Sequence, residues 1–96
     1  MSELTETTTI IERLYSFSWA LKQLRSGLKV QRKGWNGKGM YIELQIPNEN
    51  SKMTLPYIFM KTVDNNFVPW LASQTDILAD DWDLFWFMFH KFKGDI

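Results

Sequence analysis

Few side chains in this chain could carry out chemistry. The sequence holds one histidine, His90, and no cysteine, which excludes disulfides, thiolate zinc sites, two-histidine zinc sites and cysteine nucleophiles. Asp80, Asp81 and Asp83 form a carboxylate cluster. Adjacent residues point in different directions on any regular element, so we interpret these as solvated carboxylates and not as a magnesium site. We therefore expect a protein that binds a ligand without turning it over, and that uses no metal and no cofactor.

A glycine-rich segment, Gly34-Trp35-Asn36-Gly37-Lys38-Gly39, is the strongest candidate for binding. Asn-Gly is typical of a tight hairpin turn, and the glycines allow a ligand to approach the backbone closely. The turn does not explain Trp35, whose ring either packs on the core or stacks against a ligand. Gly37-Lys38-Gly39 alone is a weak phosphate motif, because no strand-to-helix geometry accompanies it.

The distribution of charge supports an anionic ligand near this segment. Eleven basic and eleven acidic residues cancel, which argues against a non-specific nucleic-acid binder. No acid lies between Glu12 and Glu43, yet seven basic residues do: Arg13, Lys22, Arg25, Lys29, Arg32, Lys33 and Lys38. For Lys22 and Arg25 a solvated helix face is the better interpretation. We expect Arg32, Lys33 and Lys38 to neutralise a phosphate.

The apolar spacing predicts the elements that position these residues. Residues 10–26 are typical of one long helix; a break near residues 15–18, with Ser18 as N-cap, is equally compatible, and Gly27 ends the helix in both cases. Alternation predicts strands over 28–33 and 40–46, joined by the glycine segment. A further pair is predicted at 55–63 and 67–70, around a turn at 64–66 and shortened by a proline.

The last third of the chain predicts a short helix and a buried strand. Ser73 is a candidate N-cap with Asp76 near the positive end of the helix. Residues 82–90 are apolar on both strand faces after Asp83, so residues 84–89 are a candidate assembly surface for a second subunit. The element order predicts an α+β domain with an N-terminal helix packed on a mainly antiparallel sheet and a short second helix, and we expect it to be homo-oligomeric.

Length and composition agree with one small folded domain. Ninety-six residues with 16% aromatics are typical of one folded domain. No signal peptide is evident, and no apolar run reaches the roughly 18 residues of a membrane span. We expect a soluble, cytoplasmic protein with no membrane partner and no nucleic-acid partner.

Two composite motifs resemble the Thoeris anti-defence 2 family of small phage and prophage proteins. The first combines residues 17–34 with the glycine segment and Met40, and continues in Pro56-Tyr57-Ile58 and Met60-Lys61-Thr62. The second runs through Val68-Pro69-Trp70, Ala72-Ser73-Gln74-Thr75-Asp76, Leu78-Ala79 and Asp81-Trp82. The resemblance covers about residues 16–84, which implies an N-terminal extension over 1–15 and a single domain over 16–96.

The resemblance implies a sponge protein in the cytoplasm of an infected bacterium. Such a protein binds and sequesters, without cleavage, a cyclic nucleotide immune signal made by Thoeris defence, a glycocyclic ADP-ribose. It also implies a homotetramer, a dimer of dimers, with ligand pockets between protomers. Alternatives are a sponge for cyclic di- or oligonucleotides, an enzyme that degrades such nucleotides, and a phage module that binds a host protein.

The residues that we expect to bind the ligand come from both motifs. The resemblance assigns Trp35 and Asn36 to the base and residues 73–76 to polar contacts, whereas Asn36 and Gln74 also offer amide edges by their chemistry. The full set is Arg32, Trp35, Asn36, Gly37, Lys38, Met40, Trp70, Ala72, Ser73, Gln74, Thr75 and Asp76. We expect Trp35→Ala to leave the melting temperature nearly unchanged and to abolish ligand binding.

Overall fold

The first described helix is shorter than the long helix that the periodicity predicts. The structure, a computed structural model, describes residues 15–85. Helix α2 (Phe17–Arg25) begins after Ser16, whose side chain accepts a hydrogen bond from the Trp19 N–H. Tyr15 has a φ of 68°, which no helical residue adopts, so the break is real and the N-cap is Ser16, not Ser18. Gly27, with a φ of 87°, follows the helix end as predicted.

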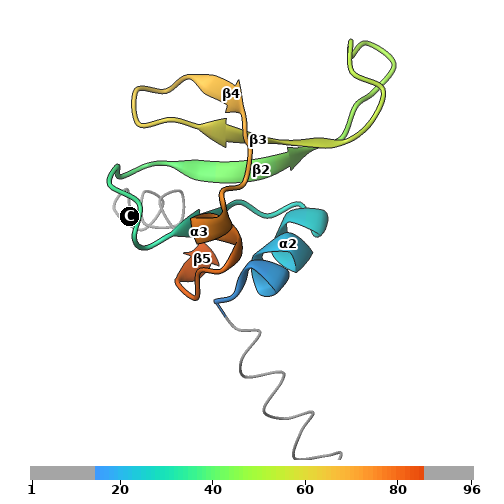
Figure 1. The fold of residues 1–96 in the computed structure, drawn as a ribbon. Coiled ribbons are helices and arrows are strands. Elements are labelled where there is room, and N and C mark those ends of the chain that lie inside the picture. The colour runs from blue at the N-terminus through green and yellow to red at the C-terminus, as the bar shows by residue number, and fades with distance from the viewer. Residues whose placement is uncertain (1–14, 86–96) are drawn as a thin grey trace, which may run out of the picture.

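Five antiparallel strands form one sheet in the order β4-β3-β2-β1-β5 (Figure 1). Their bounds are β1 (Val30–Arg32), β2 (Tyr41–Gln45), β3 (Tyr57–Lys61), β4 (Phe67–Pro69) and β5 (Trp82–Leu84). All five lie inside the predicted ranges, and the first four are shorter than predicted. The pairing of the last strand with the first is set by Arg32 opposite Trp82. This pairing brings residues 81–85 beside the start of the glycine segment.

The glycine segment is a longer loop than an Asn-Gly hairpin. The register between β1 and β2 pairs Val30 with Ile42, so residues 33–40 form the connection. The left-handed residue in this loop is Gly39, with a φ of 82°, and neither Asn36 nor Gly37 has a positive φ. The turn chemistry predicted for Asn36-Gly37 is therefore wrong, since a two-residue type I′ turn needs positive φ at both positions.

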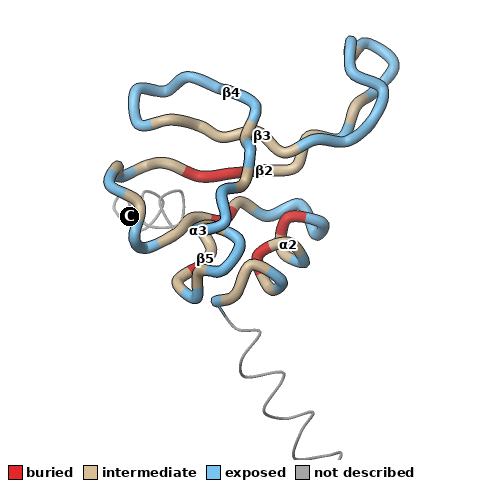
Figure 2. The backbone as a smooth tube through the Cα atoms, viewed as in Figure 1, coloured by how far each residue is buried: buried red, intermediate tan, exposed pale blue. Residues whose placement is uncertain are grey.

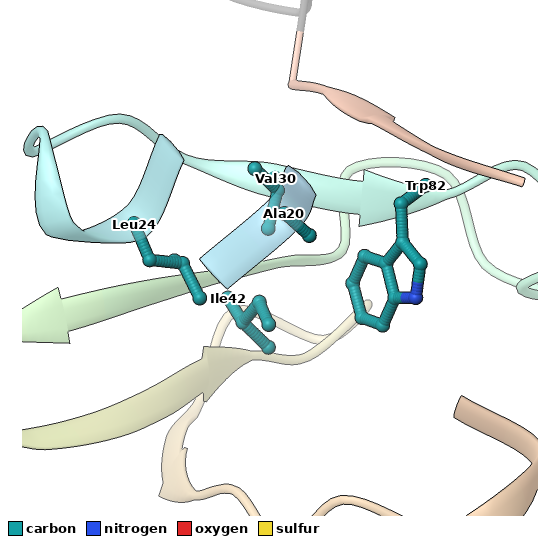
Figure 3. Packing of buried hydrophobic residues seen from close by; sticks show 5 residues of the cluster. All are labelled: Ala20, Leu24, Val30, Ile42 and Trp82. Atoms are coloured by element: carbon teal, nitrogen blue, oxygen red, sulfur yellow. The ribbon is translucent and has the colours of Figure 1, made fainter. Parts of the chain in front are cut away.

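Helix α2 covers one face of the sheet and forms the core with it. The buried cluster consists of Ala20 and Leu24 from the helix with Val30, Ile42 and Trp82 from three strands (Figure 3). Figure 2 shows the same distribution, with the buried residues confined to α2 and the strands next to it. Trp82 is the largest fully buried side chain, at 0% exposure. The sequence places it between two aspartates, and this position gives no sign of its depth.

The second described helix lies on the same face. Helix α3 (Gln74–Ile77) follows β4, and the Trp82 indole Nε1–H donates to the backbone oxygen of Asp76 at 2.9 Å. Because Trp82 also packs with α2, both helices contact the same side of the sheet. The opposite face carries aromatic side chains, Tyr41, Tyr57, Phe59, Phe67 and Phe85, that no described helix covers.

The rest of the predicted C-terminal strand lies outside the described residues. β5 ends at Leu84, and residues 86–90, together with most of the proposed assembly surface at 84–89, are not described. Residues 1–14, which include the predicted N-terminal part of the helix, are likewise outside. Between Tyr15 and Phe85 no helix is long and apolar enough to cross a membrane.

Candidate ligand site at the glycine loop

Arg32 holds two carboxylates of the second motif beside the glycine loop. Its Nε–H donates to Oδ1 of Asp81 at 2.7 Å, and its Nη1–H donates to Oδ1 of Asp76 at 2.9 Å. The backbone N–H of Gly34 donates to the other Asp81 oxygen at 2.8 Å. A Cβ at Gly34 would lie 2.7 Å from that oxygen, so the close approach requires glycine. The network joins the start of the loop to residues 76–81.

The same hydrogen bonds fix the charge states of these groups. The Arg32 hydrogen bond lowers the pKa of Asp81, although burial opposes it, and the Gly34 N–H lowers it further. For Asp76, burial acts to raise the pKa, but hydrogen bonds from Arg32, Ser73 and Trp35 outweigh it and lower the pKa. The two carboxylates in turn raise the pKa of Arg32, chiefly through the hydrogen bond to Asp81. All three side chains are charged at neutral pH.

Asp76 is also the residue at which the two sequence motifs meet. Ser73 is the N-cap as predicted, and Asp76 completes a capping box with it: the Ser73 Oγ accepts from the Asp76 N–H at 3.0 Å, and the Asp76 carboxylate accepts from the Ser73 N–H. Its Oδ1 also accepts from the indole Nε1–H of Trp35 at 3.4 Å. The Asp76 carboxylate thus pairs with Arg32 at the end of β1, caps α3 and accepts a hydrogen bond from the loop tryptophan.

Trp35 packs against the core. Its ring meets Trp82 edge to face, with 5.4 Å between ring centroids and an interplanar angle of 80°. Trp70 meets Trp82 in the same manner at 6.1 Å and 87°, so Trp82 connects the two predicted stacking residues. These contacts lead us to expect a loss of stability in Trp35→Ala, in place of the unchanged melting temperature, because the ring contributes to the packing and its N–H to the Asp76 network.

The predicted site residues fall into three groups. Arg32, Trp35, Ser73 and Asp76 are brought together by hydrogen bonds, and Trp70 joins them through Trp82. Gly37 lies against Met40, because a Cβ on it would stand 2.8 Å from the Met40 sulfur, and Ala72 is half-buried. The third group consists of exposed side chains that make no hydrogen bond or ion pair within residues 15–85: Asn36, Lys38, Gln74 and Thr75.

Two expectations about charge need correction. Asp81 is not a solvated carboxylate, because it accepts from Arg32 and Gly34. Arg32 does not present a free charge to a phosphate, because two carboxylates neutralise it. Sequence reasoning missed Asp81 and Trp82 as parts of the site. The absence of acids between Glu12 and Glu43 was the available signal, since a basic segment in a neutral chain finds its counter-ions elsewhere in the sequence.

The glycine loop thus presents free polar groups beside an anchored tryptophan. Trp35 and Asp76 are hydrogen-bonded to each other. The exposed amide of Asn36 follows Trp35 directly, and the exposed Gln74 and Thr75 lie within two positions of Asp76. Amides can read the edge of a base and hydroxyls can accept or donate, so the arrangement suits a ligand with several hydrogen-bonding edges. Within the described part of the chain, no group of three His, Asp or Glu side chains could hold a metal ion.

The fold and this site define a small α+β domain with an aromatic, amide-bearing loop anchored to a helix cap. Residues 15–85 match the model of the Thoeris anti-defense 2-like domain. The chain is similar to Thoeris anti-defense 2 of Bacillus phage SP01, with 39% identity over 82 residues, which cover 72% of this chain and 92% of that protein. The chain belongs to the Thoeris anti-defense 2-like family, and its role is accordingly one of anti-defence.

Proposed function

We propose that this protein binds a cyclic nucleotide immune signal of Thoeris defence, a glycocyclic ADP-ribose, and sequesters it without cleavage in the cytoplasm of the infected bacterium. The observation that carries the proposal is the Trp35–Asp76 hydrogen bond. It joins the two family motifs into one structure and leaves the free side chains of Asn36, Gln74 and Thr75 at their junction. Family membership supplies the anti-defence role.

The proposal includes binding without turnover. Asp76 and Asp81 are both committed to Arg32, and hydrogen bonds hold their pKa values below the usual range, so neither is suited to act as a general base near neutral pH. A sponge has to compete with a receptor, which requires a dissociation constant of about 1 nM, or roughly −12 kcal/mol. A single stacked base contributes about 1–3 kcal/mol, so several contacts must converge on the ligand.

The proposal also includes a homotetramer with ligand pockets between protomers. The exposed groups of the glycine loop cover only one side of a nucleotide, and a second protomer would supply the other side. The sheet face away from α2 is apolar enough for such an assembly, with Phe67 at 66% and Tyr57 at 39% exposure. Sedimentation velocity at micromolar concentration tests this part, and a monomer at all concentrations would contradict it.

A depletion and release experiment tests the sponge. Purified protein is incubated with the glycocyclic ADP-ribose, filtered to remove free ligand and then heated. Recovery of the intact signal from the denatured protein supports sequestration. A cleaved product would instead identify an enzyme, and an undepleted signal would exclude both. Repeating the incubation with cyclic dinucleotides separates the proposal from its alternative, a sponge for a related signalling defence.

A matched pair of amide variants localises the binding to the glycine loop. Asn36→Ala removes an exposed amide that has no partner among the described residues. Asn50→Ala makes the same change in the exposed connection between β2 and β3. We expect depletion to fail in the first variant and to persist in the second. Equal depletion by both would remove the loop from the site, and a host protein that copurifies without any nucleotide would favour the interaction module.

A further inference from the structure

The lysines near the glycine loop gather on the sheet face away from Arg32. A pocket of about 440 Å³ lies between the loop, β2 and β3 and the end of β5. Three lysines line it: Lys29 before β1, Lys38 in the loop and Lys61 at the end of β3. The other lining residues are Gly39, Tyr41, Val63, Asn65 and Phe85. The Arg32 network does not contribute to this pocket.

The floor of the pocket is the ring of Tyr41. The Lys29 Nζ lies 5.1 Å from the centre of this ring and the Lys61 Nζ lies 5.9 Å from it, and both distances are typical of cation–π contacts. The rings of Phe85 and Tyr41 are 4.8 Å apart, so Phe85 forms an aromatic wall beside the lysines. Tyr41 itself is only 8% exposed. Burial, with the nearby charge of Glu43, raises its pKa, so the phenol keeps its proton.

The three ammonium groups lack an acidic partner in the described part of the chain. No carboxylate of residues 15–85 lies within 4.0 Å of Lys29, Lys38 or Lys61, whereas Arg32 and Lys33 both have one. Lys61 donates to the carbonyl oxygen of Gly39 at 2.9 Å, which fixes its head group at the loop. Like charges that share a pocket repel one another, and an anion with several oxygens relieves that repulsion.

We propose that this pocket binds the phosphate groups of a nucleotide, with Lys29, Lys38 and Lys61 as the ligands of a diphosphate. The volume exceeds that of a diphosphate group and leaves room for a sugar or a base beside Tyr41 and Phe85. Lys38 lies between this pocket and the Trp35 side of the loop. The pocket and the Trp35 site therefore share one short loop. The inference rests on the proposed function, which supplies the identity of the bound nucleotide.

Calorimetric titration with defined probes tests the pocket. Inorganic pyrophosphate, ADP-ribose and uncharged adenosine are titrated separately into the full chain at low salt. We expect pyrophosphate and ADP-ribose to bind, to weaken as salt rises, and to shift the amide resonances of Tyr41 and Lys61 in NMR spectra. Binding of pyrophosphate without ADP-ribose would make the pocket a site for free inorganic anions. No binding of either anion, or equal binding of adenosine, would overturn the proposal.

Variants assign the binding to the three lysines. Lys29→Gln and Lys38→Gln remove a charge without removing a hydrogen bond within residues 15–85, and each should weaken pyrophosphate binding by about tenfold. Lys61→Arg keeps the charge and the capacity to donate to Gly39, so it should bind far better than Lys61→Gln. Lys52→Gln, on the exposed connection between β2 and β3, is the matched control and should bind as the unchanged protein does.

The outcomes separate this inference from the sponge itself. If the signal is depleted normally by a Lys29→Gln/Lys61→Gln double variant, the sponge stands and the pocket is excluded as its phosphate site. If the unchanged protein binds pyrophosphate through these lysines but does not deplete the signal, the pocket stands and the proposed function is overturned. Circular dichroism of each variant shows whether a lost affinity reflects a lost fold.

Discussion

The Nε of Arg32 donates to Oδ1 of Asp81 at 2.7 Å, across 49 positions of sequence. Arg32 ends the first strand and Asp81 directly precedes the last, and the antiparallel pairing of Arg32 with Trp82 places the two side by side. The contact links the first and last strands at the start of the glycine loop. We expect this network, and the loop that it fixes, to respond to substitution and to acid.

Removal of the Arg32 charge should destabilise the protein. Arg32→Gln leaves Asp76 and Asp81 partly buried without their common partner, and we expect the free energy of unfolding to fall by about 2 kcal/mol. Denaturant unfolding followed by tryptophan fluorescence measures this. Lys33→Gln is the control, because its contact to Asp83 spans 3.8 Å with the lysine largely exposed; it should change stability by less than about 0.5 kcal/mol. Equal effects would contradict the assignment.

Trp35 should matter for both stability and binding. Trp35→Ala removes the edge contact with Trp82 and the hydrogen bond to Asp76, so we expect a loss of about 2 kcal/mol, below the range for a fully buried tryptophan. Trp35→Phe keeps an aromatic edge and should recover at least half of that stability. Thermal and denaturant unfolding of the two variants decide the point. Unchanged stability in Trp35→Ala would return the ring to a role in ligand contact alone.

Gly39 should not accept a side chain without cost. Its φ of 82° is strained for L-residues, so Gly39→Ala should reduce the free energy of unfolding by about 1 kcal/mol. Gly39→Asn should cost less, since asparagine adopts this conformation more readily than alanine. Steric crowding is not the reason, because the nearest side-chain atom to a Cβ at this position is the Lys61 Nζ at 3.6 Å, an ordinary contact distance. An alanine variant as stable as the original, in denaturant unfolding, would contradict the backbone argument.

The paired carboxylates should make stability depend on acid pH. The folded-state pKa values of Asp76 and Asp81 lie below the unfolded value of about 3.9, so their contribution is fully present well above that pH. It is lost as the pH falls from there through the lower folded-state pKa values. Asp81→Asn should be less stable than the original protein at pH 6. Between pH 6 and pH 2, its free energy of unfolding, measured with denaturant, should fall by less than that of the original protein. Asp80→Asn is the exposed control and should keep the original profile.

Much of the fold follows from local chemistry along the chain. Alternation located β1 and β2, apolar runs and turn residues located the other three strands, Ser73 is the predicted N-cap, and Gly27 follows the end of the first helix. The α+β class with an antiparallel sheet is confirmed. The helix start was the weaker point, because the spacing was compatible with one long helix and with a break capped by Ser18, whereas the structure shows a break at Tyr15 and a cap at Ser16. The ends of the first four strands were also overextended, since pairing depends on register.

The candidate site is harder to predict, because its members are far apart in sequence. The glycine segment and the second motif, through the family resemblance, indicated Trp35, Asn36 and residues 73–76 as candidate site residues. They could not show that Asp81 neutralises Arg32. Nor could they show that Lys61, on β3, joins Lys29 and Lys38 around Tyr41, because that group depends on the pairing of Tyr41 with Lys61.

The sequence by itself determined the elements, the absence of thiol chemistry and the two motifs that carry the family resemblance, because each depends on residues close together along the chain. Only the tertiary structure decided where the charges lie. A segment that is uniformly basic in sequence is divided by the sheet, since strand residues alternate between its two faces. Arg32 lies on the helix side with two carboxylates, and Lys29 and Lys61 lie on the other side over an aromatic ring.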